Sequence, residues 1–141
     1  IDVAGATGYL DTDYAAKGRY AIEALKRLDL VYVHVEATDE AGHSGLAHEK
    51  VKAIEEIDRH IVGPIVESLA HEDSWRLFVA PDHYTPVVRK THEPDPVPFI
   101  FAGSDVKTSS GLPYTEKSAQ RSVVHVEEGY SLMRHLVSGW K

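Results

Sequence analysis

Two short stretches of the sequence carry residue types that are suited to metal-dependent chemistry. The first contains Asp39 and His43 in the order Asp-Glu-Ala-Gly-His, and the second contains Asp82 and His83, followed further along by His92. Imidazole and carboxylate ligands together suit borderline divalent ions such as zinc or manganese. A pair of such ions can stabilise both the attacking and the leaving oxygen of a phosphoryl transfer. The residues therefore indicate a two-metal site for phosphoryl transfer.

The first motif has two interpretations. Asp39 and His43 are four residues apart, so one helical turn would place the carboxylate and the imidazole on the same side, close enough to share an ion. Aspartate is also a preferred helix cap, and in that case Asp39 would cap a following helix while His43 is merely exposed. The motif alone does not decide between them.

The second motif is harder to explain without a ligand. The pair Asp82-His83 follows an apolar run, and burying two polar groups there costs free energy unless each has a partner, which a metal would supply. The simpler interpretation is a turn that begins at Pro81-Asp82. His92 alone would more often be a surface histidine than a ligand. Because all three elements lie near expected strand ends, together they favour a metal site.

The elements that would position these residues follow from hydrophobic periodicity. Helices alternate with buried strands, which predicts an α/β domain with a mostly parallel sheet flanked by helices. In such sheets ligands bind outside the carboxyl ends of the strands, where both motifs lie. Helices are expected at residues 14–28, capped by Asp11-Thr12-Asp13, at 48–69, kinked or divided by Pro64, and at 127–137. Strands are expected at residues 30–35, 75–80 and 97–102, and a surface loop at residues 103–122.

Composition excludes several classes of function. The chain has 141 residues, 43% of them hydrophobic, which suits one domain with a real core. Fifteen basic and twenty-two acidic residues give a net charge of −7, which argues against a nucleic-acid or anionic-membrane surface. Cysteine is absent, and no apolar run approaches the roughly 20 residues that span a bilayer. We expect a cytoplasmic protein and, since the chain begins with Ile1, a fragment of a longer polypeptide.

Several motifs together resemble one known family. They are Glu36-Ala-Thr-Asp-Glu-Ala-Gly-His43-Ser-Gly, Ile54-Glu-Glu-Ile-Asp58, Ala80-Pro-Asp-His83-Tyr-Thr-Pro-Val, Thr91-His92 and Pro96-Val-Pro-Phe-Ile. In order and spacing they are similar to the cofactor-independent phosphoglycerate mutases, most closely to the archaeal-type branch within the alkaline phosphatase superfamily. The resemblance runs from about Gly5 to Phe101, and more weakly to Leu136. It implies that the chain is part of an alkaline phosphatase-like domain.

The resemblance also implies roles for individual residues. Asp39, His43 and His92 would bind one divalent ion, and Asp82 with His83 would contribute to a second, the ions being manganese, zinc, cobalt or magnesium. In the family, a nucleophilic serine and a further aspartate lie upstream, and a substrate-orienting domain is inserted after them. Residues 1–141 would then be the carboxyl-terminal portion of the domain, inactive alone. Ser44 follows a ligand but does not match the place of the nucleophile.

The implied reaction is the interconversion of 2- and 3-phosphoglycerate in glycolysis and gluconeogenesis, through a phosphoserine, with a small phosphorylated substrate as partner. Two alternatives remain open. The same fold and metal ligands serve phosphatases, phosphodiesterases and phosphonate hydrolases, and the chain could also be a non-catalytic module. Arg89 and Lys90 could contact a phosphate, although basic residues near a loop are more often solvated charge.

Overall fold

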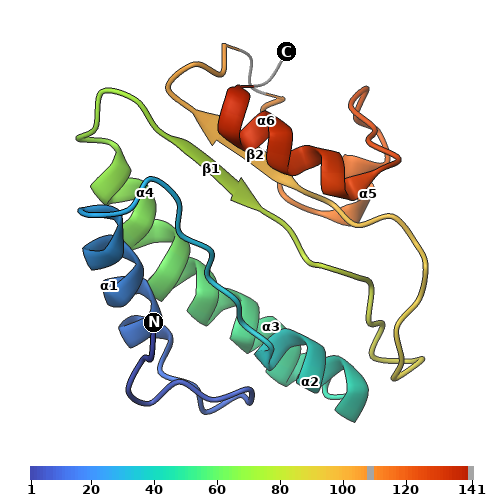
Figure 1. Cartoon of the computed structure of the whole chain (residues 1–141). Coiled ribbons are helices and arrows are strands. Elements are labelled where there is room, and N and C mark those ends of the chain that lie inside the picture. Colours follow the sequence, from blue (N-terminus) through green and yellow to red (C-terminus); the bar gives the residue numbers. More distant parts are fainter. Residues whose placement is uncertain (108–109, 140–141) are drawn as a thin grey trace. The chain divides into compact units, whose positions relative to one another are not determined.

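The computed structural model describes residues 1–107 and 110–139 and divides into two compact units (Figure 1). One unit, called the helical unit below, comprises Ile1–His71 and Thr85–Glu93. The other, called the sheet unit, comprises Glu72–Tyr84 and Pro94–Lys141. Within the described ranges, no helix has the length and apolar character needed to cross a membrane.

The helical unit contains a long helical run that matches the expected helix at residues 48–69. It consists of α3 (Ala47–Ile57), a π-helical segment (Asp58–Val62) and α4 (Gly63–Leu69). Pro64 lies in the first turn of α4, directly after the π segment. The wider π turn just before it marks the division. The prediction that Pro64 divides this helix is confirmed.

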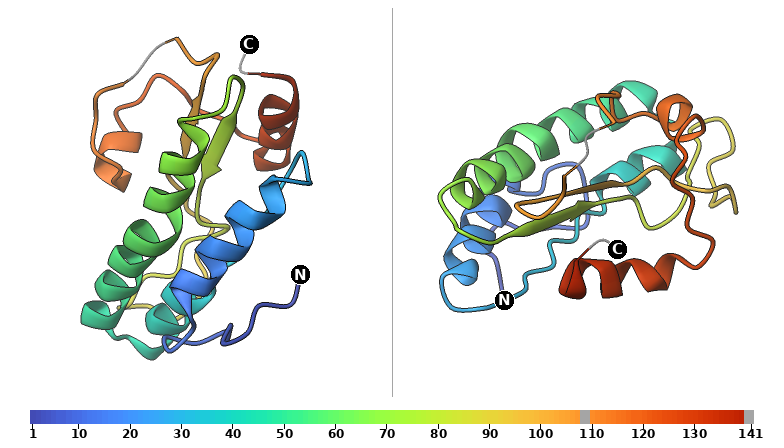
Figure 2. Two further views of the ribbon diagram at one scale, coloured as in Figure 1. Left: turned by 90° about the vertical axis from the view of Figure 1, so that its left-hand side faces the viewer. Right: turned by 90° about the horizontal axis from the view of Figure 1, so that it is seen from above.

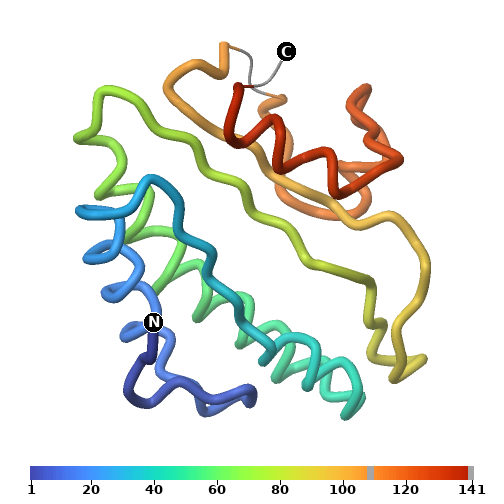
Figure 3. Tube along the Cα trace, in the orientation of Figure 1, coloured from blue at the N-terminus to red at the C-terminus, as the bar shows by residue number. Residues whose placement is uncertain are grey.

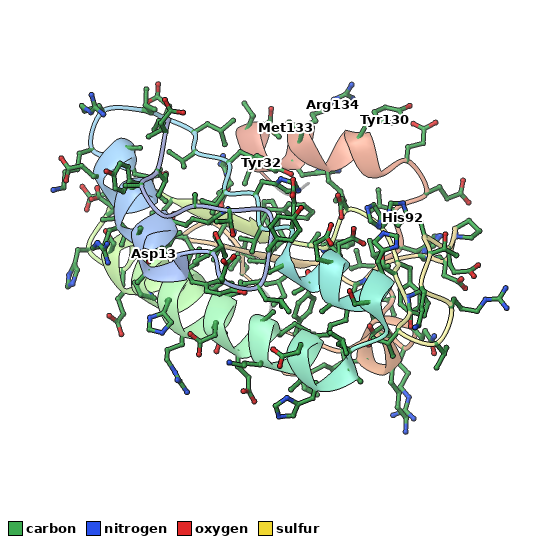
Figure 4. The ribbon with its side chains drawn as sticks, turned by 90° about the horizontal axis from the view of Figure 1, so that it is seen from below. Asp13, Tyr32, His92, Tyr130, Met133 and Arg134 are labelled. Atoms are coloured by element: carbon green, nitrogen blue, oxygen red, sulfur yellow. The ribbon has the colours of Figure 1, made fainter. Side chains whose placement is uncertain are left out.

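Helix α1 (Tyr14–Leu25) confirms the expected first helix, although it ends three residues before position 28. Its N-cap is Asp13, whose carboxylate accepts a hydrogen bond of 2.7 Å from the Ala16 N–H, and Figure 4 labels this residue beside the helix. Ala16, Ala21 and Ala24 are buried. These small side chains let α1 pack closely against the π segment and α4, as both views of Figure 2 show.

The prediction of a strand at residues 30–35 was wrong. The segment that connects α1 to the next helix forms no strand, and Figure 3 shows it as an uncoiled stretch of chain between the two helices. Leu30 is 49% exposed and Tyr32 is 77% exposed, so the segment is not buried on both faces. A β-strand is stabilised by hydrogen bonds to a neighbouring strand, and no strand of the helical unit's described residues lies beside this one.

The sheet unit contains a two-stranded sheet, and its direction corrects the expectation of a mostly parallel sheet. Strands β1 (Arg76–Val79) and β2 (Ile100–Gly103) pair antiparallel in the described chain, with Arg76 opposite Gly103 and Val79 opposite Ile100. A parallel pair needs a long crossover, usually through a helix. The connection from Val79 to Ile100 contains no helix, so the chain simply returns beside itself. The α/β character holds, whereas the parallel character is not confirmed.

The end of the chain differs from the expectation in detail. The expected loop at residues 103–122 includes a short helix, α5 (Glu116–Ala119), and positions 108 and 109 of that expected loop lie outside the described residues. The expected final helix begins later, with a 3-10 turn (Gly129–Ser131) that leads into α6 (Leu132–Ser138).

One arginine connects three parts of the sheet unit. The Arg76 guanidinium in β1 donates hydrogen bonds to the Asp105 carboxylate at 2.8–3.2 Å, and to the carbonyls of Leu136 and Val137 at 3.1 and 3.0 Å. The last carbonyls of a helix lack intrahelical partners, so a cation there is favourable. Arg76 thus fastens the end of α6 to the sheet.

Candidate metal centre

Helix α2 (Ala37–Ser44) holds the first pair of expected ligands. Asp39 lies in its first turn and His43 in its last, and Gly45 ends the helix in the left-handed conformation at φ 74°. The four-residue spacing brings Asp39 Oδ2 to 3.2 Å from His43 Nε2. The two side chains thus lie on the same side of one helical turn, and their sharing of an ion stays a prediction. Asp39 does not cap a helix, because Glu36 precedes the first residue of α2.

A loop of the helical unit adds the third expected ligand. His92 lies in the segment Thr85–Glu93, and Figure 4 labels its side chain. Its Nε2 is 3.1 Å from His43 Nε2 and 3.5 Å from Asp39 Oδ1. The two imidazole rings have centroids 4.9 Å apart and are tilted by 49°. Asp39, His43 and His92, called the triad below, therefore converge on one point although His92 is distant in sequence.

The backbone of the same loop fixes the orientation of His43. Its Nδ1 lies 3.0 Å from the carbonyl oxygen of Lys90. A carbonyl can only accept a hydrogen bond, so Nδ1 carries the proton, and in the neutral imidazole Nε2 keeps its lone pair. Lys90 has φ 55°, a left-handed conformation that is uncommon for a residue other than glycine. A strained backbone thus presents the carbonyl that aims Nε2 of His43 toward the other two side chains.

The spacing of the triad fits a divalent ion. Zinc binds imidazole nitrogen and carboxylate oxygen at about 2.0–2.2 Å, so two ligands in tetrahedral geometry lie about 3.3–3.6 Å apart. The separations of 3.1 Å between the two Nε2 atoms and 3.2 Å between His43 Nε2 and Asp39 Oδ2 lie close to that range, and His92 Nε2 lies 3.5 Å from the other carboxylate oxygen, Oδ1. Two neutral nitrogens and one carboxylate oxygen are also a donor set that zinc and manganese accept.

The triad is open on one side. The exposed fractions of the side chains are 29% for Asp39, 38% for His43 and 51% for His92. Structural metal sites are closed by four protein ligands, whereas catalytic sites keep a position for water or substrate. Three converging side chains with this exposure match the second arrangement.

The other two expected ligands lie together in the sheet unit. Asp82 and His83 follow β1 closely, as predicted, and Asp82 Oδ2 is 3.5 Å from His83 Nε2. The Asp82 carboxylate also accepts a hydrogen bond of 3.1 Å from the His83 N–H. The side chain of Asp82 is 63% exposed, so the argument from the cost of burying it does not hold.

Sequence reasoning missed two residues that support the triad. The Thr85 hydroxyl donates a hydrogen bond of 2.6 Å to Asp39 Oδ1, and Lys50 Nζ in α3 donates one of 2.7 Å to the Thr85 carbonyl. The only available signal was the position of Thr85 shortly after Asp82-His83, and a threonine at such a place is usually a turn residue. Nothing in the spacing of Lys50 distinguishes it from a solvated lysine.

The basic residues of the loop have local roles. Arg89 donates a hydrogen bond of 2.8 Å to the Glu93 carboxylate, and this contact raises the pKa of Arg89. Lys90 contributes its carbonyl to His43. The Arg89 side chain is thus engaged with Glu93, whereas the Lys90 contact involves only the backbone, and phosphate contact by these side chains stays untested.

A hollow of the sheet unit is lined by other residues than these motifs. It has a volume of about 540 Å³, and its lining includes Phe99 just before β2, residues of β2 and Tyr114, and none of the expected ligands. The Tyr114 hydroxyl donates to the Pro98 carbonyl at 3.1 Å, and burial raises the pKa of Tyr114 to about 12. Tyr114 is therefore a neutral phenol bonded to the backbone, as expected of a packing residue.

Comparison with known proteins shows the family of the chain. The family model described as metalloenzyme superfamily matches residues 1–137. The chain belongs to the metalloenzyme superfamily. This membership gives independent support for divalent metals as cofactors, and it confirms the sequence resemblance.

Curated relatives in this superfamily carry the name expected from the motifs. A 2,3-bisphosphoglycerate-independent phosphoglycerate mutase of Methanothrix thermoacetophila is 48% identical over 140 residues, and this match covers 99% of the chain but 36% of the relative. A second, from Methanothermobacter thermautotrophicus, is 50% identical over 133 residues and is covered to 33%. The solved PH0037 protein of Pyrococcus horikoshii superposes with a TM-score of 0.75 at 36% identity, over 84% of this chain and 36% of its own. The chain thus spans about a third of the length of these relatives.

Proposed function

We propose that this chain supplies one complete metal triad, and part of a second metal site, to an enzyme that interconverts 2- and 3-phosphoglycerate. The observation that carries the proposal is the convergence of Asp39, His43 and His92 within 3.1–3.5 Å. The names of relatives at 45–50% identity support this reaction over others in the superfamily. Asp82 and His83 are proposed to bind the second ion together with groups outside these 141 residues.

The proposed chemistry divides the work between metals and protein. Bound divalent ions supply Lewis acidity, which neutralises negative charge on a phosphoryl group and favours the alkoxide of a serine nucleophile. The triad holds one ion, and the Lys90 carbonyl keeps the His43 tautomer that leaves Nε2 free to bind it. The nucleophilic serine is proposed to lie outside this chain. We therefore expect no mutase activity from the 141 residues alone.

Phosphorus NMR of the full-length polypeptide, incubated with 3-phosphoglycerate and manganese, tests the proposal. Appearance of 2-phosphoglycerate without inorganic phosphate is the expected result. Release of inorganic phosphate would replace the mutase with a phosphatase of the same superfamily. No change in the spectrum would contradict both activities and favour a non-catalytic module.

A matched pair of variants connects the reaction to the triad. His43→Ala removes a proposed ligand, whereas His48→Ala removes an exposed histidine at the start of α3. We expect the first variant to lose conversion at manganese concentrations that saturate the parent protein, and the second to keep it. Equal activity of the two variants would count against the triad.

A further inference from the structure

Thr85 is a buried polar residue that contacts a proposed ligand directly. It is 4% exposed, and its hydroxyl donates a hydrogen bond of 2.6 Å to Oδ1 of Asp39. A hydrogen bond from a hydroxyl to a carboxylate in this distance range is charge-assisted and stronger than one between neutral groups. The contact holds one carboxylate oxygen of Asp39, while Oδ2 is the atom that faces His43.

Two helices hold Thr85 in this position. Lys50 Nζ of α3 donates a hydrogen bond of 2.7 Å to the Thr85 carbonyl. Gly42 of α2 approaches the same residue so closely that a Cβ at position 42 would lie 2.7 Å from the Thr85 carbonyl oxygen and 2.9 Å from its Cγ2. Thr85 is thus fixed both by a cation and by close backbone packing, which makes its hydroxyl a preorganised donor.

We propose that Thr85 is a positioning residue for the metal, an inference that rests on the proposed function. By donating to Oδ1, which also lies 3.5 Å from His92 Nε2, the hydroxyl fixes the rotation of the Asp39 carboxylate and thereby the direction of Oδ2 toward His43. Hydrogen-bond partners of metal ligands typically change metal affinity by about 10–100-fold when they are removed. A threonine that merely satisfies its own hydroxyl in the core would have no such effect.

The chain offers a matched control for this test. Thr12 is also 4% exposed and lies in the helical unit, where its hydroxyl oxygen accepts a hydrogen bond of 3.0 Å from the Thr7 N–H. Thr12→Val and Thr85→Val remove the same atom from equally buried sites, but only Thr85 contacts the triad. Thr85→Ser keeps the hydroxyl and should restore binding.

In the experiment, the full-length protein is titrated with manganese chloride alone and binding is measured by calorimetry. The visible absorption spectrum of the cobalt-substituted protein is recorded as a second readout. We expect Thr85→Val to weaken the binding of one equivalent of metal by about 10–100-fold and to change the visible spectrum of the cobalt-substituted protein. Thr85→Ser and Thr12→Val should bind like the parent protein. If Thr85→Val does not fold, Thr85→Ser and Thr85→Ala take its place, because that pair also differs by the hydroxyl.

The outcomes separate this inference from the proposed function. A parent protein that binds no manganese would overturn the metal site and the role of Thr85 with it. Normal binding by the parent, with equal affinities for Thr85→Val and Thr12→Val, would overturn the role of Thr85 alone. Weakened binding by Thr85→Val that Thr85→Ser does not restore would also overturn it, because the hydroxyl would then not be the cause.

Discussion

The loop Thr85–Glu93, called the triad loop below, contacts α2, and this contact can be tested by adding a single methyl group. Gly42→Ala places a Cβ 2.7 Å from the Thr85 carbonyl oxygen and 2.9 Å from Thr85 Cγ2, closer than real Cβ atoms approach other atoms. Because one of these neighbours is backbone, the clash cannot be relieved by a side-chain rotation. Either α2 or the loop has to move.

The expected cost follows from two opposing effects. Overpacking typically costs about 1–3 kcal/mol. Replacing glycine by alanine within a helix contributes about 0.5–1 kcal/mol in the opposite direction. The net destabilisation should be about 1 kcal/mol, which lowers the urea midpoint by about 0.5 M if the denaturant dependence is about 2 kcal/mol per molar. Manganese affinity should fall as well, because a displaced α2 moves Asp39 away from the Thr85 hydroxyl.

Urea denaturation followed by circular dichroism measures the first effect, and a manganese titration measures the second. Gly129→Ala is the control, since a Cβ at that position has no heavy atom within 4 Å. We expect Gly129→Ala to keep or slightly raise the midpoint and to leave manganese affinity unchanged. If Gly42→Ala behaves like Gly129→Ala in both measurements, the packing argument for the triad loop is refuted.

Two further predictions concern other parts of the chain. Hydrogen bonds from Arg76 lower the pKa of Asp105 below its ordinary value of 3.8, so the stabilisation from this contact is present above pH 3.8 and is lost as the pH falls through the lower folded pKa. Asp105→Asn should therefore flatten the acid dependence of the melting temperature below about pH 4, and an unchanged pH profile in thermal melts would contradict this. Lys90→Gly should keep the manganese affinity of the parent protein, whereas Lys90→Val should reduce it, because a β-branched residue strongly disfavours φ 55°. Equal manganese affinities of the two variants would show that the backbone conformation at this position is unimportant.

The sequence predicted what is local in the site. Asp39 and His43 meet because a helical turn brings residues four apart to one side, and this depends only on the formation of α2. His92 is different, since its approach to His43 is made by an irregular loop that no periodicity describes. Family resemblance rather than spacing assigned it to the same ion. Thr85 was missed because burial of a single hydroxyl leaves no pattern in a sequence.

The errors in the fold have a related cause. An apolar run such as residues 30–35 has the composition of a strand, but a strand forms only when a neighbour completes its hydrogen bonds. The pairing of β1 with β2 shows the same dependence, because composition predicted both strands and did not set their direction. Helices, whose hydrogen bonds are internal, were located more accurately, including the cap at Asp13 and the division at Pro64.

One short loop supports every member of the triad. It carries His92 itself, its Lys90 carbonyl fixes the tautomer of His43, and its Thr85 hydroxyl holds the carboxylate of Asp39. Asp39 and His43 are already fixed relative to each other by α2, so the loop and the helix together define all three positions. A displacement of the loop would therefore disturb all three proposed ligands at once. Metal affinity should accordingly respond to changes in the loop even where no ligand is altered.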